Sequence, residues 1–164
     1  MTTIIVTETH VAADGMASGN GYVSWANDKK IRRYDGSVAY SVGSLVAGVK
    51  SVQEFPGDPP GICGIAGIGS LDHLEKEWRR GNLPDLKTKT DWVFLCVPDK
   101  SAVVYEYTSD YPYEDPIPVP MAWGSGGLIA RALLRAEVPL QRIIEIVTEM
   151  DQGSGGEWTV LERR

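Results

Sequence analysis

The chain has 164 residues, of which 43% are hydrophobic and 23% are charged, and its net charge is −6. These values predict one globular domain with a single core, and the acidic balance argues against a nucleic-acid-binding protein, because phosphate contacts need a basic surface. No apolar run approaches the about 18 residues of a membrane span, and no signal-peptide pattern opens the chain. We therefore expect a cytoplasmic protein that binds neither membrane nor nucleic acid.

The first third of the chain is predicted to be rich in strands, because β-branched and aromatic residues gather there between turn signals. The predicted strands are 3–7, 10–13, 22–25, 29–34 and 37–42. Asp35-Gly36 predicts a hairpin between the last two of these strands. Apolar residues then recur with a helical spacing, which predicts a helix over 44–55 that ends at the proline-rich segment 56–60.

The rest of the chain alternates between pairs of strands and pairs of helices. The spaced glycines of 61–69 predict a flexible loop, and Ser70 is a plausible N-cap of a helix over 70–80. Two strands, a proline-rich loop, two helices and a last strand follow; their predicted ranges are 91–97, 102–108, 109–120, 125–135, 139–151 and 157–161. Because strands and helices do not alternate singly, a doubly wound parallel sheet is disfavoured, and an α+β fold with sheets between helix layers is expected.

Several kinds of active site lack their required residues. The chain has two histidines, His10 and His73, and no Gly-x-Ser-x-Gly motif, so a Ser-His-Asp triad is poorly supported. Metal-ligand spacings such as Cys-x₂-Cys and the nucleotide-binding glycine motifs are absent. Cys63 and Cys96 lie in apolar stretches and are predicted to be buried free thiols.

One class of nucleophile needs no histidine. A threonine at the start of a mature chain can use its own α-amino group as general base. Thr2 takes this position once Met1 is removed. Since an α-amino group titrates at about 7.7–8.0, it can accept the hydroxyl proton near neutral pH. Such a site requires a cation near the amine, a carboxylate that holds the cation, and backbone N–H groups for the oxyanion.

Seven sequence blocks occur in an order and spacing that resemble the proteasome β-type family, and within it the bacterial heat-shock ATP-dependent protease subunit. The blocks are Thr2-Thr3-Ile4, Ala12-Ala13-Asp14-Gly15, Lys29-Lys30-Ile31-Arg32-Arg33, Val42-Gly43-Ser44, Glu75-Lys76-Glu77-Trp78-Arg79-Arg80, Gly124-Ser125-Gly126-Gly127 and Asp151-x-x-Ser154-Gly155-Gly156. Asp14 and Lys30 are 16 positions apart, which is the spacing of the family's Asp/Lys pair. The resemblance covers essentially the whole chain.

The resemblance implies a single peptidase domain over 1–164, with a four-layer αββα sandwich of two antiparallel sheets between helix layers, the N-terminal nucleophile hydrolase fold. It also implies a role for each site residue. Thr2 is the nucleophile, Lys30 lowers the pKa of its amine, and Asp14 pairs with Lys30. Gly43 gives its N–H to the oxyanion. A hydrogen-bonded network around the amine and hydroxyl is formed by Ser125, Asp151 and Ser154.

Structural explanations of these residues stay open beside the catalytic ones. Asp14 also opens an Asp-Gly turn, Lys30 is also read as a solvent-facing strand residue, and Asp151 with Ser154 also fits a helix end and glycine turn. In the family, carbonyls near such a turn can hold a cation. This adds a weak monovalent or divalent cation site at Thr148, Asp151 and Ser154, and no cofactor is required.

The implied function is a threonine-type endopeptidase subunit that hydrolyses unfolded polypeptide inside a homo-oligomeric ring or double ring, fed by an ATP-dependent unfoldase. The proline- and glycine-rich linker before the second predicted helix departs from the family, whose helices build ring contacts, so the assembly is expected to differ from a standard double ring. Two alternatives remain: a non-catalytic, ring-forming structural subunit that retains Met1, and an amidohydrolase that acts on a small amide.

Overall fold

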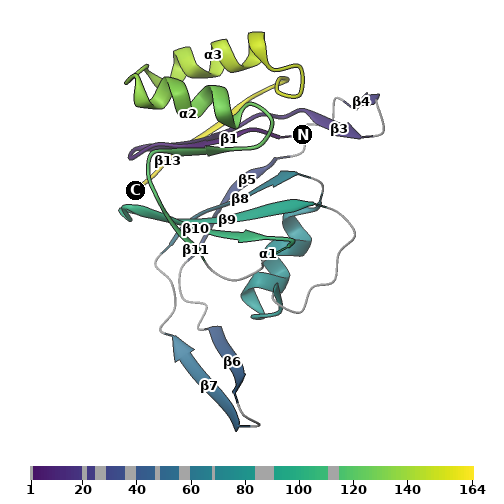
Figure 1. Ribbon diagram of the computed structural model, residues 1–164, viewed down its shortest axis with the longest axis vertical. Helices are drawn as coiled ribbons and strands as arrows, with labels where there is room; N and C mark the ends of the chain where they lie inside the picture. The colour runs from purple at the N-terminus through teal and green to yellow at the C-terminus, as the bar shows by residue number, and fades with distance from the viewer. Residues whose placement is uncertain are drawn as a thin grey trace.

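The computed structural model describes residues 2–19, 22–24, 29–35, 40–46, 49–55, 60–67, 69–83, 91–110 and 115–164, with side chains for all of these except 17–19, 22–24, 40–46 and 49–55. This part of the chain contains two main antiparallel sheets, two separate hairpins and three helices (Figure 1). The predicted α+β class is therefore confirmed, and every strand pair within the described residues is antiparallel.

The first main sheet joins the two ends of the chain in the order β12-β1-β2-β13. Its strands are β1 (Ile4–Val6), β2 (His10–Ala13), β12 (Met121–Trp123) and β13 (Thr159–Glu162). β1 is central and buried on both faces, which explains its unbroken β-branched run. Ile4 and Val6 face the other main sheet, whereas Ile5 faces the C-terminal helices.

The second main sheet has the order β11-β10-β9-β8-β5. Its strands are β5 (Ile31–Tyr34), β8 (Gly61–Gly67), β9 (Trp92–Pro98), β10 (Val103–Thr108) and β11 (Asp115–Pro118). The predicted loop over 61–69 is wrong, because β8 occupies most of it. β8 is buried on both faces, so it shows no polar alternation, and a Cβ at Gly61 would lie 2.3 Å from the Val97 carbonyl oxygen.

Two further predictions for this sheet need correction. The proline-rich segment 109–120 contains β11, an edge strand, where a missing N–H is tolerated because it faces away from the ladder. The hairpin predicted at Asp35-Gly36 falls partly on 36–39, outside the described residues, and the described strands on either side of it do not pair with each other. β5 pairs with β8 through Ile31 and Gly64, so its partner comes from farther along the chain.

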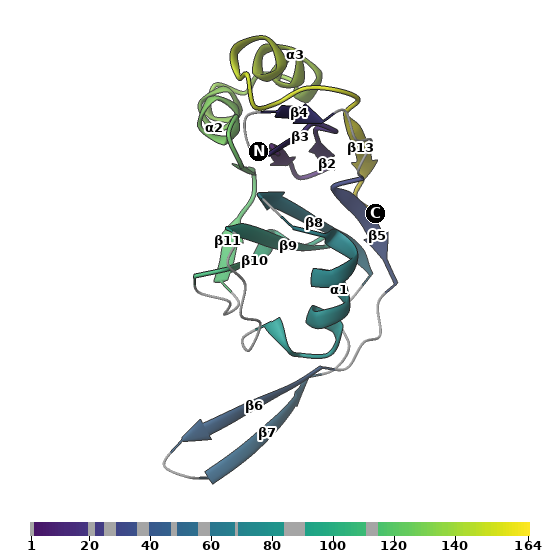
Figure 2. The same ribbon diagram turned by 90° about the vertical axis from the view of Figure 1, so that its right-hand side faces the viewer.

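Three hydrophobic clusters connect the layers of the fold. α2 (Gly127–Arg135) and α3 (Leu140–Met150) contribute to a cluster with Ile5 and Ala12 on the first sheet. A second cluster lies between the two sheets, and a third joins the second sheet to α1 (Leu71–Arg79). Figures 1 and 2 show α1 on the side of the second sheet that faces away from α2 and α3.

Two local predictions, the Ser70 cap and the burial of both cysteines, are confirmed. The Ser70 hydroxyl caps α1 by accepting from the His73 N–H at 3.4 Å, as predicted. Cys63 and Cys96 are buried and are not joined in a disulfide, also as predicted. Among the described residues, no helix has the length and apolar character that crossing a membrane would require.

The two hairpins are β3–β4 (Ala17–Gly19 and Tyr22–Ser24) and β6–β7 (Tyr40–Val46 and Val49–Phe55). The helix predicted over 44–55 is therefore wrong. Its valines and phenylalanine combine a helical spacing with high β propensity, and the paired strands satisfy the backbone of 40–46 and 49–55. Figures 1 and 2 show this hairpin extending away from the two main sheets, at the end of the molecule opposite α3.

Candidate active site

Thr3, the residue immediately before β1, is the centre of a buried polar cluster. Its backbone N–H donates to Asp14 Oδ1 at 2.9 Å, and its hydroxyl oxygen accepts from the Gly126 N–H at 2.8 Å. The same hydroxyl lies 2.5 Å from Ser154 Oγ. Thr3 is fully buried. Three distant parts of the chain therefore hold the residue that follows the predicted nucleophile.

Asp14 lies directly after β2, and its carboxylate joins the first strand to the C-terminal turn. Its second oxygen, Oδ2, accepts from the Gly155 N–H at 3.0 Å. Burial raises the pKa of Asp14 from 3.8 to about 6, although the N–H groups of Thr3 and Gly155 act in the opposite direction. The carboxyl group can therefore change its protonation state near the pH of a cell.

Asp151 follows α3 and accepts three hydrogen bonds. Ser125 Oγ and Ser154 Oγ both donate to Asp151 Oδ2, at 2.6 Å and 2.5 Å, and the Gly153 N–H donates to Oδ1 at 3.1 Å. Burial acts to raise the pKa of Asp151, but the bonds from Ser125, Ser154 and Gly153 outweigh it and lower that pKa below its usual value. Asp151 is thus held as an ionised acceptor.

The direction of the hydrogen bonds follows from this charge. Since an ionised carboxylate can only accept, Ser154 donates its proton to Asp151. Ser154 Oγ then accepts from the Thr3 hydroxyl, which itself accepts from the Gly126 N–H. A directed series therefore runs from the backbone of Gly126 through Thr3 and Ser154 to Asp151. The structure brings the predicted residues Asp14, Ser125, Asp151 and Ser154 together at the start of β1.

The predicted nucleophile, Thr2, adjoins this cluster but forms no side-chain hydrogen bond within the described part of the chain. Thr2 is 1% exposed. Its carbonyl oxygen packs so closely on Gly124 that a Cβ there would lie 1.7 Å away, and Gly124 has a φ of 92°, which suits glycine. No role for Thr3 was predicted from the sequence. The only feature that could have indicated one is its place as the second threonine of the Thr2-Thr3 pair.

Lys30 lies immediately before β5, and its carbonyl accepts from the Ile65 N–H at 2.9 Å. It is only 7% exposed. The expected ion pair with Asp14 does not form in the described structure, where each carboxylate oxygen of Asp14 accepts a backbone N–H. Lys30 has no ion-pair partner among the described residues, and it lines a cavity together with Gly69 and Ser70.

Gly43 is not brought to this cluster. It lies in β6, opposite Val52 of β7, in the hairpin that extends away from the main sheets (Figure 2). The expectation that Gly43 serves the oxyanion is therefore not met by this arrangement. The described glycine that lies between β8 and α1 and lines a cavity with Lys30 is Gly69. A glycine followed by the helix cap Ser70 was the available signal in the sequence, but the predicted flexible loop hid it.

The cation site predicted at Thr148, Asp151 and Ser154 stays a prediction. Thr148 Oγ1 donates to the Ile144 carbonyl at 2.8 Å and accepts from Trp158 Nε1 at 3.0 Å. The Asp151 carbonyl accepts from the Ser154 N–H at 3.1 Å. No cluster of His, Cys, Asp and Glu suited to a metal occurs within the described residues, although carbonyl ligands would leave no such cluster.

Neither a protein-family model nor a curated protein matches the chain. Two solved structures that are similar to it are those of Thiobacillus denitrificans BPH, one of them in complex with epoxomicin. Each is 14% identical and covers 99% of this chain and 98% of its own, with TM-scores of 0.57 and 0.56. At this identity, the likeness shows a shared fold over nearly the full length of both chains.

Proposed function

We propose that the protein is a threonine-type endopeptidase subunit of a self-compartmentalising, proteasome-like protease, with Thr2 as nucleophile once Met1 has been removed. The observation that carries the proposal is the convergence on Thr3 of Asp14, Ser154 and the Gly126 N–H. This arrangement fixes the residue next to Thr2 in three directions. An unreactive chain terminus has no need of such positioning, because terminal residues are ordinarily frayed.

In the proposed reaction, the neutral α-amine of Thr2 takes the proton of the Thr2 hydroxyl, and Oγ bonds to the carbonyl carbon of the scissile peptide. The C–N bond then breaks as the ammonium group returns its proton to the leaving amine, so an ester remains on Thr2. Water deprotonated by the same amine attacks the ester, which releases the carboxylic acid and regenerates Thr2.

The other residues position and tune this reaction. The buried charge of Lys30 disfavours a second positive charge nearby and so keeps the amine neutral. Asp14 fixes the backbone of Thr3, and Ser154 with Asp151 fixes its side chain. Backbone N–H groups at Gly69 and Ser70, which lie beside Lys30, take the oxyanion role that the sequence analysis gave to Gly43.

The finer fold and assembly belong to the same proposal. The three hydrophobic clusters support a four-layer αββα sandwich of the N-terminal nucleophile hydrolase type, forming one domain over 1–164. The complex of a protein of similar fold with epoxomicin supports a ligand-binding role for this fold. We further propose a homo-oligomeric ring or double ring in the cytoplasm, fed by an ATP-dependent unfoldase.

A non-catalytic structural subunit is the second candidate. One observation favours it: Thr2 is 1% exposed, so its hydroxyl is closed to a peptide in the chain that carries Met1. Under this alternative Met1 stays in place, and the polar cluster serves to anchor the end of the first sheet. The two candidates therefore differ in whether Met1 is removed.

Intact-protein mass, measured with and without a peptidyl epoxyketone probe, separates these candidates. We expect loss of Met1 and one covalent adduct per chain. Thr2→Ala should abolish the adduct, whereas Thr9→Ala, which replaces an exposed threonine in the turn after β1, should label like the wild type. Retention of Met1 with no adduct under any condition would instead establish the structural subunit.

A further inference from the structure

A cavity of about 290 Å³ opens between the start of β5 and the N-terminus of α1. Its lining residues are Lys29, Lys30, Arg32, Ile65, Gly69, Ser70, Leu71 and Asp72. The cavity adjoins the start of β1, because a Cβ placed on Gly64 would lie 3.1 Å from Ile4 Cδ1 and 3.3 Å from the Lys30 carbonyl oxygen. The cavity wall at Lys30 and Ile65 is therefore close to the Ile4 side chain, and Ile4 is two residues after the proposed nucleophile.

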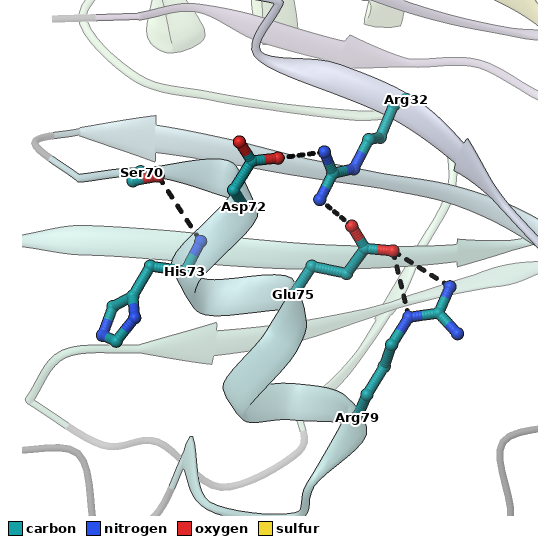
Figure 3. A network of polar contacts seen from close by, with 6 residues as sticks. All are labelled: Arg32, Ser70, Asp72, His73, Glu75 and Arg79. Carbon is teal, nitrogen blue, oxygen red and sulfur yellow. Dashed lines mark hydrogen bonds and ion pairs between the residues drawn. The ribbon is translucent and has the colours of Figure 1, made fainter.

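The charges around the cavity divide into a neutralised group and an unpaired group. Arg32 forms ion pairs with Asp72 and Glu75, and Glu75 also pairs with Arg79 at 3.0 Å (Figure 3). These two cations and two anions balance one another. Lys29 and Lys30, in contrast, have no ion-pair partner among the described residues. The net charge presented to the cavity is therefore positive.

Lys30 is the residue that points to a ligand. It is 7% exposed and lines the cavity, yet no anion of the described chain compensates its charge. A buried, unpaired ammonium group is unfavourable unless an anion or water compensates it. The first two residues of α1, Leu71 and Asp72, line the same cavity, so the partial positive charge of a helix N-terminus adds to that of the lysines.

The remaining lining residues define the shape of the anion. Ile65 is 1% exposed and Leu71 is 7% exposed, and both present apolar groups beside the cationic end of the cavity. Gly69 adds no side chain. A ligand with a short aliphatic stem and a terminal carboxylate matches this arrangement better than a compact inorganic anion does, because a phosphate ion cannot use the apolar wall.

We propose that this cavity binds the carboxylate side chain of an acidic substrate residue, preferably glutamate, next to the scissile peptide bond. This inference rests on the proposed function and names its substrate class. Lys29 and the α1 N-terminus bind the carboxylate, the buried charge of Lys30 adds to the positive potential of the cavity, and Ile65 and Leu71 contact the methylene groups. Lys29 acts as the specificity residue that is separate from the catalytic group.

The binding step can be tested without turnover, by saturation-transfer NMR on the intact protein. The probes are N-acetyl-glutamate methylamide and its glutamine analogue, with inorganic phosphate as competitor. We expect the glutamate probe to bind about tenfold more tightly than the glutamine probe, since an ammonium–carboxylate contact is lost in the latter. Equal binding of both probes, or binding of phosphate alone, would overturn the proposal.

Charge reversal at Lys29 supplies the matched comparison. Lys29→Glu should weaken binding of the glutamate probe about tenfold or more, whereas Lys76→Glu should leave it within about twofold, because Lys76 is exposed on α1 and lines a different hollow. Both variants change the net charge equally, so a loss of similar size in both would overturn a specific role for Lys29.

Peptide hydrolysis tests the glutamate specificity separately from the proposed peptidase function. Fluorogenic peptides with Glu, Gln or Leu before the cleaved bond should give the highest kcat/KM for Glu, and Lys29→Glu should lower the value for Glu more than the values for Gln and Leu. Turnover of Gln or Leu peptides with no gain for Glu would overturn this specificity alone. No turnover of any peptide and no epoxyketone labelling would overturn the proposed function itself, and the specificity with it.

Discussion

The two ends of β1 bury polar groups in different ways. At its start, hydroxyl and carboxyl groups meet around Thr3. Beyond its other end, the guanidinium of Arg163 donates to carbonyl groups of two turns: Thr7 at 2.8 Å and Glu8 at 3.3 Å in one turn, and Pro98 at 3.1 Å with Ser101 in the other. Arg163 is 7% exposed and Thr3 is fully buried, so the polar groups at both ends are largely shielded from water.

The difference lies in what each end can do with a proton. Burial lowers the pKa of Arg163 from its usual value, but a guanidinium stays protonated in a protein, and carbonyl groups only accept hydrogen bonds. That end can stabilise the fold and cannot move protons. At the start of β1, Asp14 has a pKa of about 6, and hydroxyls can both donate and accept. Chemistry is therefore expected at one end and structural support at the other.

The largest effect should come from removing the Arg163 guanidinium. Arg163→Met leaves several carbonyl groups without donors, so we expect the free energy of unfolding in urea to fall by about 4 kcal/mol. Probe labelling per folded chain should not change. Arg164→Ala is the control, and because the Arg164 side chain is exposed its effect should stay within about 0.5 kcal/mol. A full loss of labelling in folded Arg163→Met would contradict the division between the two ends.

The next effect concerns the pH dependence of stability at Asp14. Because its folded pKa is raised from 3.8 to about 6, the folded state holds a proton that the unfolded chain has lost, so its stabilising contribution is fully present below about 3.8 and is lost as pH rises through about 6. At 1.36 kcal/mol per pKa unit, wild type should lose up to about 3 kcal/mol relative to Asp14→Asn across this range.

Urea unfolding at a series of pH values measures that difference. Arg163→Met provides the reference, since it keeps Asp14 and should follow the pH slope of the wild type. If the stability of wild type relative to Asp14→Asn stays constant from about pH 4 to pH 6, or increases as pH rises, Asp14 is not protonated preferentially in the folded state.

The smallest effect should come from the hydroxyl of Ser154. Ser154→Ala breaks the series between Thr3 and Asp151, and we expect a loss of about 1–1.5 kcal/mol in stability, with slower labelling of Thr2 by the probe. Ser125→Ala removes a hydroxyl from the same carboxylate but leaves that series intact, so its effect should be smaller. If Ser125→Ala costs as much as Ser154→Ala, the series through Thr3 is not the important path.

The elements whose formation depends on neighbouring residues were predicted correctly from the sequence. The Ser70 cap, the amphipathic segments that became α1, α2 and α3, and the β-branched run of β1 all express preferences that neighbouring residues decide. Ser125, Asp151 and Ser154, which were expected to form one network, are joined by hydrogen bonds in the structure, since a resemblance in order and spacing carries such residues together.

The errors arose where long-range packing decides. The loop predicted over 61–69 became β8 because burial on both faces removes the polar alternation that marks a strand. The segment 44–55 has a helical spacing of apolar residues, but its described residues form strands of a hairpin. Gly43 lies in this hairpin and not at the site. Asp14 was expected to pair with Lys30, but its carboxylate binds the backbone N–H groups of Thr3, at the start of β1, and Gly155, in the turn after α3.

By itself, the sequence determined which residues are capable of the proposed chemistry: an early threonine, a lysine, two aspartates and two serines in a fixed order. Only the tertiary structure decided which of them meet. Thr3 and Ser154 are 151 positions apart, yet the first sheet and the turn after α3 bring their hydroxyls to 2.5 Å. The physical reason is that residue type sets the reactivity of a side chain, whereas the burial of distant strands against each other sets its neighbours and, through them, its charge.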